Sequence, residues 1–278
     1  MNARTKRNIG NTATYLFLAV CAALAFFPIT WVLMSSLKTN KEIADSPFIL
    51  PAEPQWINYR EAWVRGRFGL AMGNSAIVAV SSTLFVLVLA SLAAYAFAKM
   101  RFKGNQLLFF LFFFGMTIPN PIVIGPLLTM VYTMRLVDTL WSLILPYTAA
   151  LLPLGIMMMR AFFRGLPDEL IEAGRMDGCS NLQLLSLIVL PLALPAVFVL
   201  IVLNFLNSWR EFYFAVILIS DSAKNTLPLG LRAFQGAFVT NFALQFTGII
   251  IAAVVPIVIY ILFQKSFIRG ATAGSLKS

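Results

Sequence analysis

Six long stretches of the chain contain no charged residue, and they constrain the fold more than any other feature of the sequence. Each is longer than the ~20 residues that carry an α-helix across a bilayer. Helices are expected because a segment in lipid has to satisfy its backbone hydrogen bonds internally. The sequence therefore predicts six membrane-spanning helices and leaves no room for a soluble catalytic domain. The uncharged stretches are 8–37, 68–98, 104–134, 139–159, 178–209 and 233–264.

The composition supports an all-α integral membrane protein. Of the 278 residues, 60% are hydrophobic and only 12% are charged, whereas soluble domains average about 25% charged residues. We expect a single transmembrane domain over residues 1–278. Its spans are placed at 13–35, 72–98, 105–133, 140–159, 186–209 and 243–264.

The basic residues indicate how the chain is oriented. The net charge of +10 comes from small basic groups between the spans, of which Lys99, Arg101 and Lys103 directly follow the second uncharged stretch. Cytoplasmic connections are enriched in Lys and Arg, so both termini are expected in the cytoplasm. Because the cations are dispersed among the spans, nucleic acid is not an expected partner.

The sequence offers little for catalysis or metal binding. It has no histidine, and no P-loop, GxSxG or HExxH pattern is present. We therefore expect no enzyme activity, no metal site and no cofactor bound by this chain. The expected span interiors carry no charge, whereas secondary transporters usually place ionisable groups within the membrane. A secondary transporter is thus a weaker alternative.

Three prolines interrupt the third uncharged stretch, at Pro119, Pro121 and Pro126. A regular helix cannot pass through them unbroken. Irregular backbone at membrane depth is tolerated only inside protein or beside water. The break indicates either a kink that serves helix packing or a wall of a translocation cavity.

A short charged segment between the fourth and fifth spans has the signals of a capped helix. Pro167 suits the first helical position, Asp168 and Glu169 suit the first turn, and Arg175 suits the last turn. Gly178 suits a left-handed C-terminal cap. We expect a helix at about 167–177 and, after a cap at Ser180 or Asn181, a second short helix leading to the fifth span. A well-capped solvated loop is the alternative.

This segment also carries a spaced pattern that resembles the cytoplasmic coupling loop of ABC importer permeases. Glu172-Ala173-Gly174 precedes Gly178 and then Ile188-Val189-Leu190-Pro191. Other parts resemble the smaller permease subunit of maltose-type carbohydrate importers. They are Asn74-Ser75, Asn207–Phe212, Leu227–Leu231 and the tail Phe267–Ser278. Gly174 departs from that pattern, which usually has Ala there, and Arg210 stands where Asn is usual.

The resemblance implies a type I ABC importer permease fold with a coupling loop at 160–185. It also implies partners: a second, different permease subunit, two ATPase subunits that bind ATP and Mg, and an extracytoplasmic sugar-binding protein. The location would be the cytoplasmic (inner) membrane of a bacterium or archaeon. The residues expected to dock on the ATPase are Glu172, Ala173, Gly174, Asp177 and Gly178, with the two small residues letting the partner approach closely.

Two further segments are assigned roles through the same resemblance. The outside loop is expected to face the binding protein through Leu227, Pro228, Gly230 and Phe234, with Phe234 or Phe238 inserting into it. The tail 265–278 is expected to reach between the ATPase subunits. Glycines disfavour a continuing helix, so 270–278 is predicted to be irregular. The tail residues singled out are Arg269, Gly270, Thr272 and Gly274.

The sequence does not identify the substrate. Uncharged polar residues in the expected spans, Asn120, Tyr132, Asn204 and Asn207, are able to bind sugar hydroxyls or to join helices. An ABC importer permease for a non-sugar solute is the main alternative.

Overall fold

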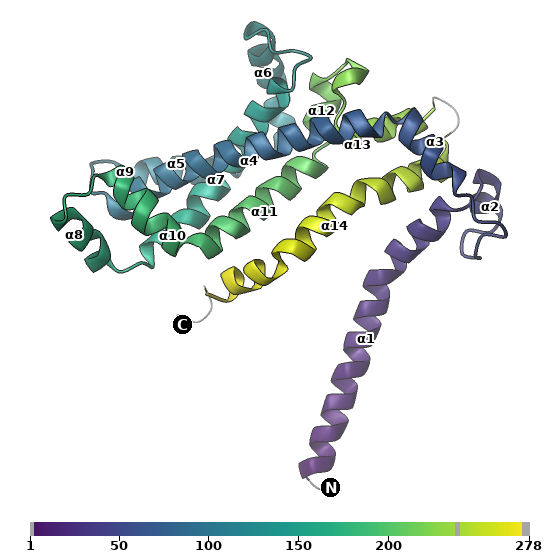
Figure 1. Ribbon diagram of the computed structural model, residues 1–278, viewed down its shortest axis with the longest axis horizontal. Helices are drawn as coiled ribbons and strands as arrows, with labels where there is room; N and C mark the ends of the chain where they lie inside the picture. The colour runs from purple at the N-terminus through teal and green to yellow at the C-terminus, as the bar shows by residue number, and fades with distance from the viewer. Residues whose placement is uncertain (1–2, 237–239, 274–278) are drawn as a thin grey trace. The chain divides into compact units, whose positions relative to one another are not determined.

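The computed structural model describes residues 3–236 and 240–273, and the side chains of residues 14–119, 121–236 and 240–264. Within this part the chain is helical, and an isolated antiparallel bridge joins Gln235 to Thr240 (Figure 1). The chain forms two compact units. One comprises residues up to Phe68 together with Leu231–Ala253, and the other comprises Gly69–Gly230 and the residues from Val254 on.

Four helices in the described part are long and apolar enough to cross a membrane. They lie in α1 (Ala3–Ser36), α4 (Phe68–Lys99), α7 (Trp141–Arg164) and α14 (Phe242–Ala273). A strongly bent pair of helices makes a fifth when the pair is counted as one broken span. Four of the expected spans are thus present as single helices, and α7 continues to Arg164 instead of ending near 159.

The third expected span is broken where the prolines predicted a break. Helix α5 (Asn105–Gly115) ends before Met116, and α6 (Asn120–Thr133) begins after Pro119. Pro119 has extended backbone angles (φ −65°, ψ 137°). With 11 and 14 residues, neither helix alone reaches the ~20 residues that a span requires.

The fifth expected span is not straight, so the prediction of one helix over 186–209 is wrong. The short helix α9 (Asn181–Gln183), the π-helix η1 (Leu184–Val189) and α10 (Leu190–Leu192) form one rod. This rod meets α11 (Leu194–Arg210) at an angle of 84°. The corner lies at Ala193, two residues before Pro195. Pro195 lies in the first turn of α11, where its missing N–H is not needed for an intrahelical hydrogen bond, so it suits the start of a new helix after the corner.

The unit that contains α1 is held together by polar contacts to backbone carbonyls. Lys38 is 1% exposed, and its Nζ donates to the carbonyl oxygens of Ser46 (2.9 Å) and Pro47 (3.1 Å). Thr247 of α14 donates to the Ser36 carbonyl at 3.1 Å. The indole ring of Trp31 packs edge-on against the ring of Phe246, with the two centroids 5.1 Å apart. Helices α2 (Asn40–Asp45) and α3 (Ile57–Arg65) complete this unit with η3 (Leu231–Phe234).

The larger unit has two apolar clusters, one toward each end of α7. The cluster toward the α7 C-terminus joins α4, α7 and α11 with the segment that follows α7. It includes Val86, Met159, Phe163, Leu184 and Leu200. The other cluster includes Val78, Leu143, Tyr147, Phe214 and Leu218, the last two from α12 (Tyr213–Leu218).

The prediction of an irregular chain from residue 270 is wrong for the residues that the structure describes. Helix α14 continues through Arg269, Gly270 and Thr272 to Ala273. One glycine costs an α-helix only about 1 kcal/mol, and extending an established helix is far easier than starting one. Gly274 and the residues after it lie outside the described part.

Candidate functional site

The charged segment after α7 folds into the predicted helix–turn–helix, which we call the hook (residues 167–192). Its first helix is α8, Asp168–Met176. Pro167 is the residue just before the helix (φ −56°, ψ 135°) and not its first helical residue. Asp168 and Glu169 lie in the first turn and Arg175 in the last, so all three charges match the helix dipole. Figure 1 shows the hook at one end of α4 and α7.

The turn after α8 is a Schellman motif, as the glycine signal predicted. The amide of Cys179 donates to the Gly174 carbonyl at 2.9 Å, and the amide of Gly178 donates to the Arg175 carbonyl at 3.0 Å. Gly178 has φ +82°, a conformation that residues with a side chain rarely adopt. The turn reverses the chain and satisfies two carbonyl groups at the end of α8.

The second helix of the hook begins at the predicted cap. The amide of Ser180 donates to Gln183 Oε1 at 2.8 Å, and the Gln183 amide donates to Ser180 Oγ at 3.4 Å. This reciprocal pair is a capping box. The helix then widens into the π-helix η1, a form often found at functional sites.

Gly174 packs inside the hook, so the expectation that it faces a partner is wrong. It is buried, and a Cβ there would lie 2.6 Å from Leu184 Cδ2 and 2.8 Å from Ile188 Cδ1. Both neighbours belong to η1. The spacing between Gly174 and Ile188 thus has an internal cause, because the small residue lets α8 and η1 pack closely.

A buried lysine ties the hook to α4. Lys99 Nζ lies 2.6 Å from Asp168 Oδ1 and 2.7 Å from the Leu166 carbonyl oxygen. The Lys99 side chain is 4% exposed, whereas that of Asp168 is 79% exposed. The hydrogen bond and charge of Lys99 hold the pKa of the Asp168 carboxyl below its usual range. Sequence reasoning used Lys99 only as an orientation signal, since nothing local links two residues so far apart in the chain.

The outer face of α8 makes no apolar contact that buries it. Met176 is 89% exposed and Leu170 is 42% exposed, and Ala173 between them is also exposed. Residues three apart lie on one side of a helix, so these three form one apolar stripe. The side chains of Glu169, Glu172 and Asp177, also exposed, flank the stripe. Small size, apolar character and an acidic rim suit it to docking in a groove of a partner.

A cleft of about 590 Å³ separates the end of α4 from α8. Its charged lining has both signs, with Lys99 and Arg101 on the α4 side and Asp168, Glu172 and Arg175 on the α8 side. The exposed acidic residues of α8 are therefore balanced on one side by cations of the same chain.

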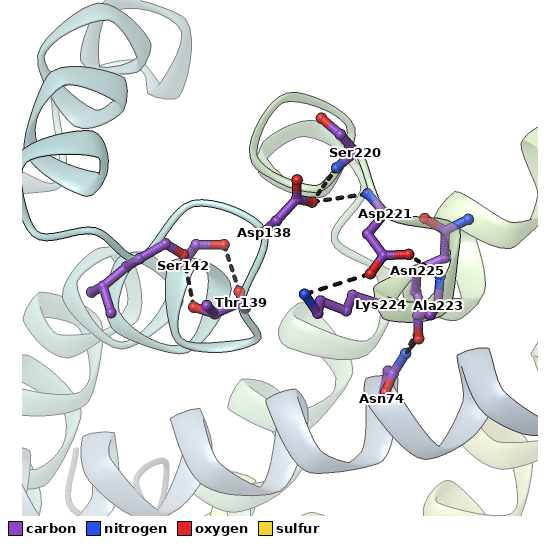
Figure 2. Close-up of polar contacts among 10 residues, drawn as sticks. Asn74, Asp138, Thr139, Ser142, Ser220, Asp221, Ala223, Lys224 and Asn225 are labelled. Carbon is purple, nitrogen blue, oxygen red and sulfur yellow. Dashed lines mark hydrogen bonds and ion pairs between the residues drawn. The ribbon is translucent and has the colours of Figure 1, made fainter.

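At the other end of the larger unit, the loop after α12 is fastened by side chains from two separate segments (Figure 2). Asn74 Nδ2 donates to the carbonyls of Ala223 (2.9 Å) and Asn225 (3.0 Å). Asp138 Oδ1 accepts from the amides of Ser220 (2.6 Å) and Asp221 (2.9 Å). These amides lower the pKa of the Asp138 carboxyl. The adjacent Ser75 accepts from the Leu227 amide at 2.7 Å, which gives the Asn74-Ser75 pair a structural role.

The residues predicted to face a binding protein are mostly buried, which corrects that expectation. Leu227 and Gly230 are buried in the short helix α13 (Leu227–Gly230), and Pro228 is half-buried. Phe234 is 3% exposed, and its ring packs edge-on against Phe68 with centroids 5.9 Å apart. It does not project outward, because burial of an aromatic ring against another is strongly favoured. Phe238 lies outside the described residues.

The exposed positions of this region lie on either side of Phe234. Arg232, Ala233, Gln235 and Gly236 are exposed. The sequence predicts the contact surface at the turn residues, whereas in the structure the residues on either side of Phe234 are exposed.

Among the described residues, no three Asp, Glu or Cys side chains gather in a way that could hold a metal ion. Tyr132, one of the polar residues considered for sugar contact, is 76% exposed, whereas Asn204 is fully buried without a hydrogen-bond partner in the described part. Asn207 donates to the Leu203 carbonyl and accepts from Arg210. Tyr132 and Asn204 thus differ in exposure, and the side chain of Asn120 lies outside the described part.

Comparison with known proteins identifies relatives over nearly the whole chain. Residues 86–271 match the family described as binding-protein-dependent transport system inner membrane component. The sulfoquinovosyl glycerol transport system permease protein SmoH of Agrobacterium fabrum is 32% identical over 96% of this chain and 94% of its own. The trehalose/maltose transport system permease protein MalG of Thermococcus litoralis is 33% identical over 92% of this chain and 93% of its own.

A solved structure has the same fold. It is a chain of a bacterial ABC transporter involved in the import of the acidic polysaccharide alginate. The TM-score is 0.80 at 21% identity, with coverage of 96% of this chain and 99% of the other. At this identity the likeness concerns the fold alone.

Proposed function

The chain belongs to the family of binding-protein-dependent transport system inner membrane components, and from this premise we propose that it is a permease subunit of an ATP-driven carbohydrate importer. Members of this family are transport subunits and not enzymes. The observation that carries the coupling role is the hook, which is capped at the end of α8 and at the start of α9, anchored to α4 and apolar on its outer face.

Carbohydrate as the substrate class is supported by the relatives. Full-length relatives are named for the transport of sulfoquinovosyl glycerol and of trehalose and maltose. The tail after Phe267 and the segment Asn207–Phe212 resemble those of maltose-type permeases. Since the named sugars differ in size and charge, the class and not the individual sugar is proposed.

The hook has the mechanical properties that a coupling element needs. A force on α8 reaches α4 through the pair Lys99–Asp168, where the lysine is almost fully buried. It reaches α11 through the contact of Gly174 with η1, because η1 and α10 run into the corner at Ala193. The 84° corner turns motion along the hook into rotation of α11. In this proposal the ATPase moves α8, and the spans follow.

The proposed assembly contains a second, different permease subunit, two ATPase subunits and an extracytoplasmic sugar-binding protein. ATP and Mg bind to the ATPase, and this chain binds no cofactor. Its exposed docking positions are Glu172, Ala173 and Asp177, with Leu170 and Met176 added by the structure. Gly174 and Gly178 act indirectly by shaping the hook. The location is the cytoplasmic membrane of a bacterium or archaeon, with both termini and the hook inside.

Uptake by reconstituted complexes tests this function. The chain is assembled with its ATPase, permease and binding-protein partners in proteoliposomes, and labelled maltose, trehalose, other oligosaccharides and methionine are offered. Sugar uptake that requires ATP and the binding protein is expected. Uptake of methionine but of no sugar would replace the substrate class, and ATP-independent uptake by this chain alone would refute the subunit role.

A further inference from the structure

The turn between α4 and α5 and the end of α7 enclose a second pocket, which shares Ala98, Met100 and Arg101 with the cleft between α4 and α8. Its volume is about 500 Å³, and we call it the basic pocket. Three arginines and two amide side chains provide its polar lining, and no carboxylate contributes to it. These residues are Arg101, Arg160, Arg164, Asn105 and Gln106, and most of the remaining lining is the aromatic set Phe97, Phe102, Phe109 and Phe110.

Two contacts hold the side chain of Arg160, which lines this pocket. Its Cζ lies 3.7 Å from the centroid of the Phe109 ring, and its Nε donates to the Phe97 carbonyl at 3.4 Å. The Phe97 ring in turn packs edge-on against Phe109 at 5.8 Å. A guanidinium has five N–H donors in a rigid fork, so most of them remain for a ligand once Nε is used.

Arg160 and Arg164 of the basic pocket form no ion pair within the described part of the chain, whereas Arg101 also lines the cleft between α4 and α8, opposite Asp168. The ion pairs found there are Arg65–Glu61, Lys99–Asp168 and Lys224–Asp221, and none includes a pocket arginine. Arginines gathered without a carboxylate match the fork geometry of a phosphate group. The positive charge of the pocket therefore favours binding of an anionic ligand.

The surface beside the basic pocket indicates what kind of anion fits. Helix α5 starts at the pocket and exposes large apolar side chains along its length, including Leu107 (67%), Leu111 (58%) and Phe114 (62%). Phe110 lines the pocket and is itself 45% exposed. An anionic head and an apolar body are therefore accommodated side by side, at the end of an apolar helix where a bilayer surface would lie.

We propose that the basic pocket binds the phosphodiester headgroup of an anionic membrane phospholipid, with the acyl chains lying along α5. Basic pockets between transmembrane helices bind acidic lipid headgroups by the same electrostatics. The continuity with α5 favours a lipid over an acidic segment of a partner protein, which would need no apolar strip. The site depends only on the chain's being embedded in a membrane and not on its substrate.

Lipid titration followed by native mass spectrometry tests the site on the purified full-length chain in a neutral detergent. Phosphatidylglycerol and phosphatidylcholine with identical acyl chains are the probes, with glycerol phosphate as the free headgroup. We expect one phosphatidylglycerol to bind at least about tenfold more tightly than phosphatidylcholine. The double variant R160Q/R164Q should weaken phosphatidylglycerol binding by about tenfold or more, since charge-assisted hydrogen bonds are lost.

The control is Arg65→Gln, which removes an exposed arginine elsewhere in the chain and should leave lipid binding unchanged. Arg101→Gln, on the exposed rim of the basic pocket, decides the matter if the double variant aggregates, and it should also weaken binding. Equal binding of both lipids, or unchanged binding in the folded pocket variants, would overturn the proposal. The proposal would also be overturned if glycerol phosphate bound as tightly as the lipid. The same holds if the pocket variants lost the ATPase from the assembled complex but still bound the lipid.

Discussion

Replacement of Gly178 by alanine isolates the contribution of one backbone conformation to the hook. Gly178 has φ +82°, and nothing lies within 4 Å of a Cβ built on it, so the substitution adds strain without a steric clash. A left-handed conformation costs a non-glycine residue roughly 1–2 kcal/mol. The reduced freedom of the unfolded chain returns about 0.4–1 kcal/mol. The net destabilisation of the turn is therefore about 1 kcal/mol, which is about a fivefold change in an equilibrium constant.

Amide hydrogen exchange on the purified full-length chain measures this change directly. The amides of Gly178 and Cys179, which close the Schellman turn, should lose protection about fivefold in Gly178→Ala. Gly178→Asn should lose less, because asparagine tolerates the left-handed region. Gly73→Ala is the matched control, since a Cβ at this position in α4 also meets nothing within 4 Å and Gly73 has no positive φ. Unchanged protection in Gly178→Ala, or an equal loss in Gly73→Ala, would refute the reasoning.

Three further predictions concern the outer face of α8, the loop after α12 and the buried ring of η3. Met176→Lys should release the ATPase during co-purification without altering hydrogen exchange in the hook, because Met176 is 89% exposed and touches little of its own chain. Co-purification of the ATPase at the level of the unmodified chain would contradict the docking role. The depressed pKa of Asp138 means that its contribution to stability is present above the unfolded pKa of about 3.9 and is lost as the pH falls through the lower folded value. Asp138→Asn should thus flatten the acid limb of a thermal-stability profile, and an identical limb would be evidence against these hydrogen bonds. Phe234→Ala should destabilise the protein by about 3–5 kcal/mol in thermal unfolding, whereas the change at an exposed position, Gln235→Ala, should not. A Phe234→Ala protein that stays stable but no longer responds to the binding protein would support the original prediction that Phe234 contacts that protein.

The sequence predicted those parts of the structure whose causes are local. The left-handed cap at Gly178, the capping box at Ser180 and the break at Pro119 each depend on a few neighbouring residues. The family membership was likewise predicted from the spaced pattern around Glu172, and the relatives bear it out.

The errors concern features that depend on residues distant in the chain. Gly174 was expected to face a partner, because sequence shows its small size but not that Leu184 and Ile188 fold back onto it. Phe234 was expected to project, since its packing against Phe68 joins residues far apart. The pair Lys99–Asp168 was missed for the same reason.

Some corrections had a signal in the sequence that went unused. Pro195 indicates a helix start just after the corner at Ala193, but it does not by itself predict the bend, because prolines also lie inside α7 and α14. The helical continuation of α14 through Gly270 shows that one glycine does not end a long helix.

Photo-crosslinking from α8 tests the central claim, that this face of the hook contacts the ATPase. A photoreactive amino acid is placed at Ala173, an exposed position in the middle of the apolar stripe, and in a second sample at Tyr132, which is 76% exposed in α6. Irradiation of membranes that contain the assembled importer should join the chain to the ATPase from position 173 and not from position 132. An assembled complex that gives no ATPase adduct from position 173 would contradict the claim.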